Sequence, residues 1–244
     1  MIISGKNSVT EAIRADSRIE KIVIDKAKKR TFSVLIDQAV RKGIKVSYAE
    51  AIALDKQSGD KDNRGIIAVL GEFDYVDLFE KIKQIKSENT PLFLLILDGI
   101  EDPHNLGAIL RVAESAGVQA VVIAKDRACP VNSTVIKVSA GATEHIDVAK
   151  VTNINHTIRS LKESGIFVYG ADMQGEDIYN TDLSGDIAIV VGSEGKGLHQ
   201  LTRQLCDKLI ALPMLGKINS LNASVATGAV LYEAVRQRLA KDAQ

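Results

Sequence analysis

The sequence has few of the features that mark secreted, metal-binding or membrane proteins. Two cysteines in 244 residues are too few for a disulfide framework, which favours a reducing cytosol. Cys129, Cys206 and the four histidines show no metal-ligand spacing, so we predict no metal site. No apolar run approaches the roughly 18 residues of a membrane span. The N-terminal segment MIISGKNSVTEA lacks the basic and apolar regions of a signal peptide. We therefore expect a cytoplasmic protein without membrane or metal partners.

Length and composition are those of an ordinary globular protein. At 244 residues, one large or two small domains are expected, and the chain can bury a sizeable core. Hydrophobic residues make up 45% and charged residues 25% of the sequence, which is usual for soluble domains. No repeat of the length found in solenoid proteins is present, so a repeat architecture is not expected.

The formal net charge is zero, but the charges are unevenly distributed. Residues 1–71 carry 14 Lys and Arg against 9 Asp and Glu, whereas residues 72–244 carry 17 against 22. A basic N-terminal part suggests a surface that binds phosphates, because Lys and Arg supply most non-specific affinity for nucleic acids. Its densest charge run is KAKKR at residues 26–30, and taken alone such a run favours a solvated loop over a binding site.

The first 71 residues alternate between helical and strand patterns. Helices are expected at residues 9–14, 32–42 and 49–56, and strands at 21–25, 44–48 and 66–70. This alternation predicts a small α/β domain for residues 1–71. A helical pattern at residues 76–86 follows and is broken by the polar run that ends at Pro91. We therefore expect a linker of residues 72–91 and a second domain of residues 92–244.

The second domain is predicted to hold a mainly parallel sheet, because strand and helix patterns alternate along it. Strands are expected at residues 92–97, 120–124, 166–169, 187–191 and 209–212, and helices at 105–116, 132–138, 153–164 and after residue 222. Asn105 is placed to cap the first of these helices, and Ser220 or Asn222 the last. Ligands of open α/β sheets bind outside the carboxyl ends of the strands, where the connecting loops gather.

A glycine-rich loop, GSEGKG at residues 192–197, directly follows the strand at residues 187–191. Its glycines leave backbone N–H groups open to a ligand. It lacks the Lys and Ser or Thr that end a Walker A loop, and it lacks the spacing of the dinucleotide-binding motif. Taken alone, the loop is explained as well by plain turn geometry.

Three short segments of the second domain together form a more specific pattern. They are the GSEGKG loop, LPM at residues 212–214 followed by SLNASVA at 220–226, and NLGAILR at 105–111. This set resembles the SpoU/TrmH family of the SPOUT superfamily, which are S-adenosylmethionine-dependent RNA ribose 2′-O-methyltransferases. In the N-terminal part, GKNSVTEAI and RGIIAV resemble the substrate-binding domain found in many members of that family.

The resemblance implies a fold, a cofactor and partners. The fold would be α/β, with a C-terminal SPOUT-type knot (a deep trefoil on a mainly parallel sheet) and a small N-terminal α/β RNA-binding domain. S-adenosyl-L-methionine would be the cofactor, and the protein would act on RNA as a homodimer. Within the family, the chain looks closest to the bacterial enzymes that methylate a guanosine ribose of 23S ribosomal RNA. A tRNA ribose 2′-O-methyltransferase and a non-catalytic RNA-binding ribosome-assembly factor of the same fold are the alternatives.

The family's site positions map onto residues of this sequence. Arg111 would activate the ribose 2′-hydroxyl, and electrostatic stabilisation suits it better than the role of a base, because guanidinium resists deprotonation. The full set of implied catalytic positions is Arg111, Asn105, Glu194, Ser220 and Asn222. The implied cofactor-binding positions are Gly192, Gly197, Leu212, Met214 and Leu221.

Three further interpretations concern residues near these motifs. His104 is interpreted as a turn residue and not as a catalytic base. Residues 139–144 resemble a family segment that lines the site. On the last helix, a face of small residues would suit either a close dimer contact or ordinary core packing: Ala223, Ala226, Val230 and Ala234.

Overall fold

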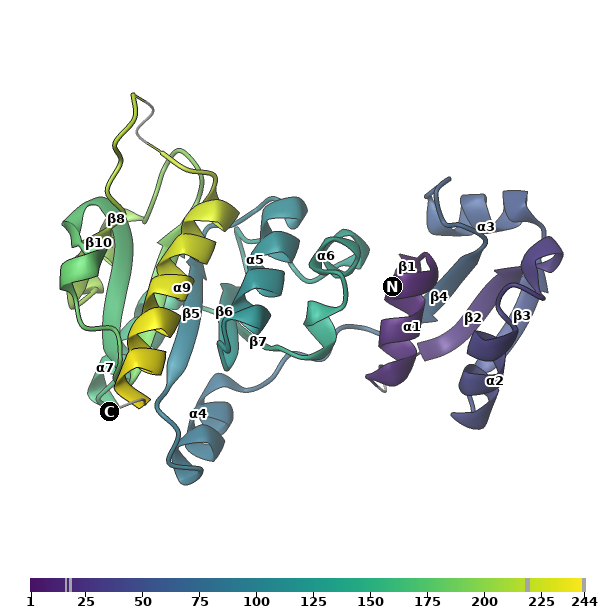
Figure 1. The fold of residues 1–244 in the computed structure, drawn as a ribbon, viewed down its shortest axis with the longest axis horizontal. Coiled ribbons are helices and arrows are strands. Elements are labelled where there is room, and N and C mark those ends of the chain that lie inside the picture. Colours follow the sequence, from purple (N-terminus) through teal and green to yellow (C-terminus); the bar gives the residue numbers. More distant parts are fainter. Residues whose placement is uncertain (16, 18, 218–219, 243–244) are drawn as a thin grey trace. The chain divides into compact units, whose positions relative to one another are not determined.

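The computed structural model describes residues 1–15, 17, 19–217 and 220–242. The chain forms two compact units (Figure 1). The first unit consists of Met1–Asp74 and Val131–His145, and the second of Tyr75–Pro130 and Ile146–Gln244. The sequence did not indicate that residues 131–145 group with the N-terminal part. The domain limits drawn from the sequence stay a prediction.

The second unit is built on a six-stranded sheet of order β10-β8-β9-β5-β6-β7. Its strands are β5 (Phe93–Asp98), β6 (Ala120–Ala124), β7 (Asp147–Val151), β8 (Phe167–Asp177), β9 (Ile187–Gly192) and β10 (Lys208–Ala211). All of its described strand pairs are parallel. Every residue of the central strands β5 and β9 is buried, as continuous apolar runs predict. The predicted α/β class with a mainly parallel sheet is confirmed.

Helices cover this sheet, and one of them comes from the predicted linker. They are α4 (Leu78–Ser87), α5 (Pro103–Ser115), α7 (Ile154–Glu163), α8 (Gln200–Leu205) and α9 (Ala223–Asp242), with a 3₁₀ turn η3 (Ile178–Asn180). In α4, Leu78, Ile82 and Ile85 lie in the same apolar core as the sheet. The helices α5 and α9 pack side by side (Figure 1). The NLGAILR segment of α5 therefore lies against the helix that begins within the SLNASVA segment.

The start of α5 differs from the sequence prediction. Asp102 is its cap, and the Asp102 carboxylate accepts the backbone N–H of His104 at 2.8 Å. Pro103 takes the first helical position, where its missing N–H costs nothing. Asn105 lies inside the first turn, so its predicted capping role is wrong. His104 lies in the helix as well, with an exposed side chain, and not in a turn.

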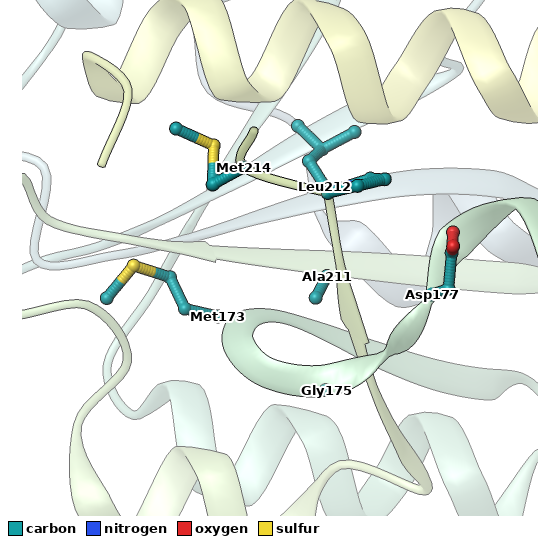
Figure 2. A pocket seen from close by; sticks show the side chains of 7 residues that line it. Met173, Gly175, Asp177, Ala211, Leu212 and Met214 are labelled. Carbon is teal, nitrogen blue, oxygen red and sulfur yellow. The ribbon is translucent and has the colours of Figure 1, made fainter. Parts of the chain in front are cut away.

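Strand β8 extends well past residue 169, where the sequence pattern ends it. It continues to Asp177 alongside β10, with an irregularity in register between Leu209 and Ile210. Gly175 lies at this place (Figure 2), and a Cβ there would come within 2.5 Å of the Ile210 nitrogen. Only glycine fits such a close approach of two backbones. The extension brings the end of β8 beside the end of β10.

The first unit holds a four-stranded sheet of order β1-β4-β2-β3. Its strands are β1 (Ile2–Ser4), β2 (Ile19–Asp25), β3 (Lys45–Ala49) and β4 (Ile66–Leu70), and its helices are α1 (Lys6–Arg14), α2 (Ser33–Arg41), α3 (Ala51–Ser58) and α6 (Ser133–Ser139), with 3₁₀ turns η1 (Lys26–Lys28) and η2 (Ala142–Glu144). Strand β2 pairs in parallel with β3 and antiparallel with β4. The predicted N-terminal α/β architecture is present, and the short β1 escaped the sequence analysis.

The segment after α6 contacts α1. Nε2 of His145 lies 2.9 Å from the Glu11 carboxylate, and the Ser17 hydroxyl donates to Glu144. Gly141, at φ +102°, faces the Glu11 side chain, which a Cβ on the glycine would meet at 2.6 Å. The described partners of this segment thus belong to the first unit. Its predicted place in the site stays a prediction.

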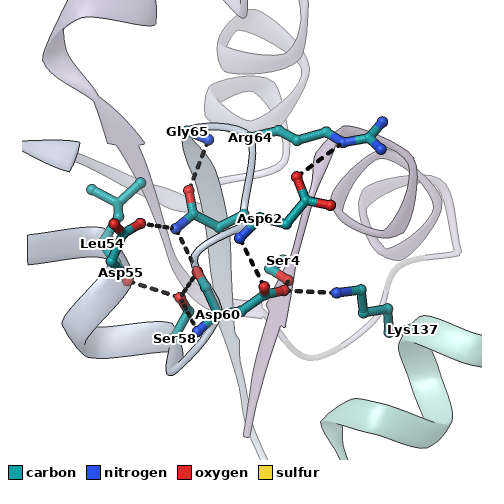
Figure 3. A network of polar contacts seen from close by, with 10 residues as sticks. Ser4, Leu54, Asp55, Ser58, Asp60, Asp62, Arg64, Gly65 and Lys137 are labelled. Atoms are coloured by element: carbon teal, nitrogen blue, oxygen red, sulfur yellow. Dashed lines mark hydrogen bonds and ion pairs between the residues drawn. The ribbon is translucent and has the colours of Figure 1, made fainter. Parts of the chain in front are cut away.

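A buried asparagine organises the loop between α3 and β4 (Figure 3). The Asn63 amide donates to an Asp55 carboxylate oxygen at 2.6 Å and to the Asp60 carbonyl at 2.8 Å, and its oxygen accepts the Gly65 N–H at 2.8 Å. Hydrogen bonds from Lys137 and Ser4 lower the pKa of Asp60 to about 2. These hydrogen bonds hold the loop at several points and so fix the backbone where it enters β4.

We expect Asn63→Ala to destabilise the first unit by about 2–3 kcal/mol, because it leaves the buried Gly65 N–H without its acceptor and removes an amide donor from Asp55 and from the Asp60 carbonyl. Native-state hydrogen exchange of the β4 amides measures the free energy of opening directly. Asp62→Ala, at an exposed position of the same loop, is the control and should stay within about 0.5 kcal/mol of the parent protein. Equal effects of the two substitutions would contradict a central role for Asn63.

Candidate cofactor and catalytic site

The glycine loop after β9 is a closed hairpin. Ser193 and Gly197 exchange two backbone hydrogen bonds, of 3.2 and 2.9 Å. A Cβ on Gly192 would lie 2.1 Å from the carbonyl carbon of Gly197, so no side chain can be placed there. Gly195 and Gly197 have φ of +81° and +65°, a region that favours glycine. The glycines thus fold the loop back tightly onto the strand end.

A buried carboxylate fixes the far end of this loop. Asp98, the last residue of β5, lies in register with Gly192 and is 6% exposed. One of its oxygens accepts the backbone N–H of His199 at 2.9 Å, and the other lies 2.9 Å from His199 Nδ1. These hydrogen bonds offset the cost of burying the charge. Asp98 was not among the site residues predicted from the sequence; its signal is an acidic residue directly after the buried run at residues 92–97.

One side chain joins the three motifs. The Asn222 amide donates to Asn105 Oδ1 at 2.9 Å and to a Glu194 carboxylate oxygen at 3.0 Å. Its own Oδ1 accepts the Ser224 N–H at 2.9 Å and the Ser224 hydroxyl at 2.6 Å. Asn222 therefore caps α9, as predicted, and also ties α9 to α5 and to the glycine loop.

A cavity of about 410 Å³ lies beside this junction. Residues of β8 and α8, the loops that follow β9 and β10, and the first turns of α9 line it. Its walls include all five predicted cofactor positions and two of the predicted catalytic ones: Gly192, Gly197, Leu212, Met214, Leu221, Glu194 and Ser220. A second cavity of about 460 Å³ adjoins it; Met173 and Met214 reach that cavity from β8 and from the loop after β10 (Figure 2).

Both apolar and charged side chains line the cavity. Ala223, Ala226 and Val230 of α9 line it together with Leu212 and Leu221. Charged side chains also line it, from three other segments: Asp172, Glu194, Lys196 and Arg203. A ligand with a flat apolar part and a charged part would be complementary to such walls.

Arg111 stands apart from this cluster. It lies on α5 after the first turn that carries Asn105, and its side chain is exposed. Within the described ranges, its side chain neither lines the cavity nor hydrogen-bonds to Asn105, Asn222 or Glu194. The guanidinium thus lies where a molecule outside the chain can reach it.

The small-residue face of α9 packs within the chain. Ala223, Val230 and Ala234 are buried against the body of the second unit, and Ala226 lines the cavity. Of the two interpretations that the sequence left open, ordinary core packing accounts for this face. Three apolar side chains spaced seven residues apart are exposed instead, on another side of α9: Val225, Tyr232 and Leu239.

The described residues give little support for a cysteine nucleophile or a metal site. Burial raises the pKa of both cysteine thiols, that of Cys206 to about 12, so the reactive thiolate is disfavoured. Among the residues that the structure describes, no group of three or more His, Cys, Asp or Glu could hold a metal ion. No helix in the described part of the chain has the length and hydropathy needed to cross a membrane.

Two family models match the sequence over nearly its whole length. Residues 92–232 match the SpoU rRNA methylase family, and residues 2–76 match the model described as RNA 2'-O ribose methyltransferase substrate binding. The first match contains all ten predicted site residues. The second covers the part of the chain that is rich in Lys and Arg.

Curated relatives match over similar lengths. A Bacillus subtilis protein whose name places it among TrmH family tRNA/rRNA methyltransferases is 42% identical, covering 97% of this chain and 95% of its own. The 23S rRNA (guanosine-2'-O-)-methyltransferase RlmB of Xanthomonas campestris is also 42% identical, covering 97% of this chain and 96% of its own.

A solved structure confirms the fold. The SpoU methyltransferase AviRb from Streptomyces viridochromogenes, in complex with the cofactor AdoMet, superposes with a TM-score of 0.82 at 23% identity. The superposition covers 98% of this chain and 91% of that one. With the family models, the close relatives and the junction at Asn222 in agreement, the chain belongs to the SpoU rRNA methylase family.

Proposed function

We propose that this protein transfers a methyl group from S-adenosyl-L-methionine to the 2′-hydroxyl of a guanosine ribose in 23S ribosomal RNA. The observation that carries the proposal is the Asn222 junction, which joins three motifs beside a ligand-sized cavity. Relatives that are about 42% identical over almost the full chain carry this activity in their names, which sets the substrate.

The cavity fits the proposed cofactor. At about 410 Å³ it lies within the range of small-molecule sites, and its apolar and charged lining suits a molecule that has both kinds of group. Gly192, Leu212 and Leu221 would offer backbone groups, with Met214 as an apolar contact. S-adenosylmethionine supplies an electrophilic methyl group when it is bound. The chain's own residues need only to orient the reactants and to activate a weakly acidic hydroxyl.

In the proposed mechanism, Arg111 acts on the RNA side of the site. A guanidinium stays protonated, so it stabilises negative charge on the ribose oxygen or fixes an adjacent phosphate. Asn222 holds Glu194 and Asn105 at fixed places, and Ser220 lies in the cavity wall. Glu194 accepts the Asn222 amide, which keeps its carboxylate oriented toward the junction.

We assign RNA binding to residues 1–71. Support comes from the substrate-binding family model and from the excess of Lys and Arg in this part. All residues of the KAKKR run are exposed at the carboxyl end of β2. There, Lys29 Nζ lies 4.9 Å from the ring centroid of Tyr48, and Lys28 Nζ donates to the Arg64 carbonyl at 3.2 Å. Cations beside an exposed aromatic ring suit an RNA strand.

The proposal includes a homodimer, a trefoil knot and a cytoplasmic location. The exposed stripe of Val225, Tyr232 and Leu239 on α9 supports a second copy of the chain as a partner. A knot is supported by the path from β10 at the sheet edge back to α9, which packs on α5. The cytoplasmic location is proposed because bacterial relatives are named as methyltransferases of 23S rRNA.

Transfer of labelled methyl groups distinguishes the proposed activity from its alternatives. Purified protein with tritiated S-adenosylmethionine should label unmodified 23S RNA, in a guanosine whose 3′ linkage then resists alkali. Label in transfer RNA alone would favour the tRNA activity, which the name of the Bacillus relative also includes. RNA binding without label in either substrate would favour a non-catalytic assembly factor.

Arg111→Ala should lower the rate of methyl transfer by about 10²-fold or more, because it removes charge stabilisation at the reacting oxygen. Affinity for S-adenosylhomocysteine should stay within about threefold, since the side chain does not line the cavity. Arg111→Lys should fail as well, because a point charge does not reproduce a planar fork of donors. The control is Arg159→Ala, which removes an exposed arginine of α7. Parent-like turnover in Arg111→Ala would remove Arg111 from the mechanism.

The salt dependence of RNA affinity tests the KAKKR run in the full chain. If Lys28 and Lys29 contact phosphates, replacing both with Ala should lower the slope of log affinity against log salt by about 1.4–1.8. The matched control replaces Lys21 and Lys45, which pair with each other at the opposite end of the β2–β3 ladder. The control should keep the slope of the parent protein. Equal slopes for all three proteins would identify KAKKR as a solvated loop.

A further inference from the structure

An arginine outside the family motifs forms part of the cavity wall. Arg203 of α8 reaches the middle of β8, where its Nε lies 3.2 Å from an Asp172 carboxylate oxygen. Its Nη2 donates to Gln174 Oε1 at 2.6 Å. The Gln174 N–H donates to the other Asp172 oxygen at 2.9 Å, which closes a three-residue network. All three residues line the 410 Å³ cavity.

This ion pair is partly shielded from water. The Asp172 side chain is 17% exposed and that of Arg203 is 36% exposed. A second pair, Lys208 with Glu176 at 2.7 Å, also links β8 to the chain after α8, but its glutamate is 66% exposed and neither residue lines the cavity. Charges near a cavity with an apolar wall interact with a ligand more strongly than charges in open solvent do.

The Arg203 guanidinium can donate hydrogen bonds to a further partner. Among the described residues, the hydrogen bonds of its guanidinium involve Nε and Nη2, so the Nη1 donors are available. An arginine fork is the side chain best suited to a carboxylate, and the Asp172 carboxylate beside it suits an ammonium group. An α-amino acid carries both groups on one carbon.

We propose that the Arg203–Asp172 pair recognises the amino-acid end of the cofactor, and so sets its orientation in the cavity. The inference rests on the proposed function, which requires a ligand with an adenosine and a zwitterionic end. The apolar wall of α9 and of the loop after β10 is left for the adenosine part. Two other charged residues line the cavity: Glu194 is engaged by Asn222, and Lys196 is exposed in the glycine loop.

Two ligands that differ only at this end test the proposal by calorimetry. S-adenosylhomocysteine has the amino-acid chain, whereas 5′-methylthioadenosine has a methyl group in its place. Arg203→Ala should weaken binding of the first ligand by about 10- to 100-fold, which corresponds to the loss of charge-assisted hydrogen bonds. Binding of the second should change by less than about twofold, and that unchanged affinity also shows that the variant is folded.

Matched variants sharpen the result. Asp172→Asn keeps the size and shape of the side chain. It should also weaken binding only of the ligand with the amino-acid chain. Lys208→Ala breaks the neighbouring ion pair and should change neither affinity. Equal losses for both ligands in Arg203→Ala, or no loss for either, would overturn the proposal. Failure of the parent protein to bind either ligand would instead overturn the proposed function.

Discussion

The side-chain amide of Asn222 is the interaction on which the site depends. It donates to Glu194 of the glycine loop and to Asn105 of α5, while its oxygen caps α9. Three segments separated by up to 117 residues meet at this one group. They can meet because the parallel sheet places the ends of β5 and β9 at one edge, as register between Asp98 and Gly192 requires. The arrangement of the strands brings the three segments together, and the hydrogen bonds of the Asn222 amide then hold them in place.

Two kinds of constraint prepare this junction. Glycines permit the close backbone approaches: Gly192 against Gly197, and Gly175 against Ile210. The buried Asp98 carboxylate then fixes the far end of the glycine loop, since it contacts both the backbone N–H and the imidazole ring of His199. The glycine loop is therefore tied at both ends, by Asn222 through Glu194 and by Asp98. A preorganised loop loses less conformational entropy on binding a ligand, which raises affinity without new contacts.

The sequence predicted most of what depends on local pattern. Apolar runs located the central strands, and the three motifs located the cavity wall and the junction. At the start of α5 it misread a local signal, since Asp102 followed by Pro103 is itself a typical helix start. It also failed where tertiary contacts overrode local pattern: β8 continues through polar residues because β10 pairs with it. The grouping of α6 with the first unit rests on long-range contacts such as that of Lys137 with Asp60. Arg203 and Asp172 escaped for the same reason, because no spacing in sequence relates them.

Hydrogen exchange with and without S-adenosylhomocysteine tests the central claim most directly, namely that one cofactor site forms where β8 and the loops after β9 and β10 converge. The account predicts new protection at residues 171–174, 192–199, 210–214 and 220–226, and unchanged exchange at residues 1–74. Such confinement follows because most residues of the cavity wall lie in these segments and none lies in residues 1–74. Protection centred on the first unit, or no protection at saturating ligand, would contradict it.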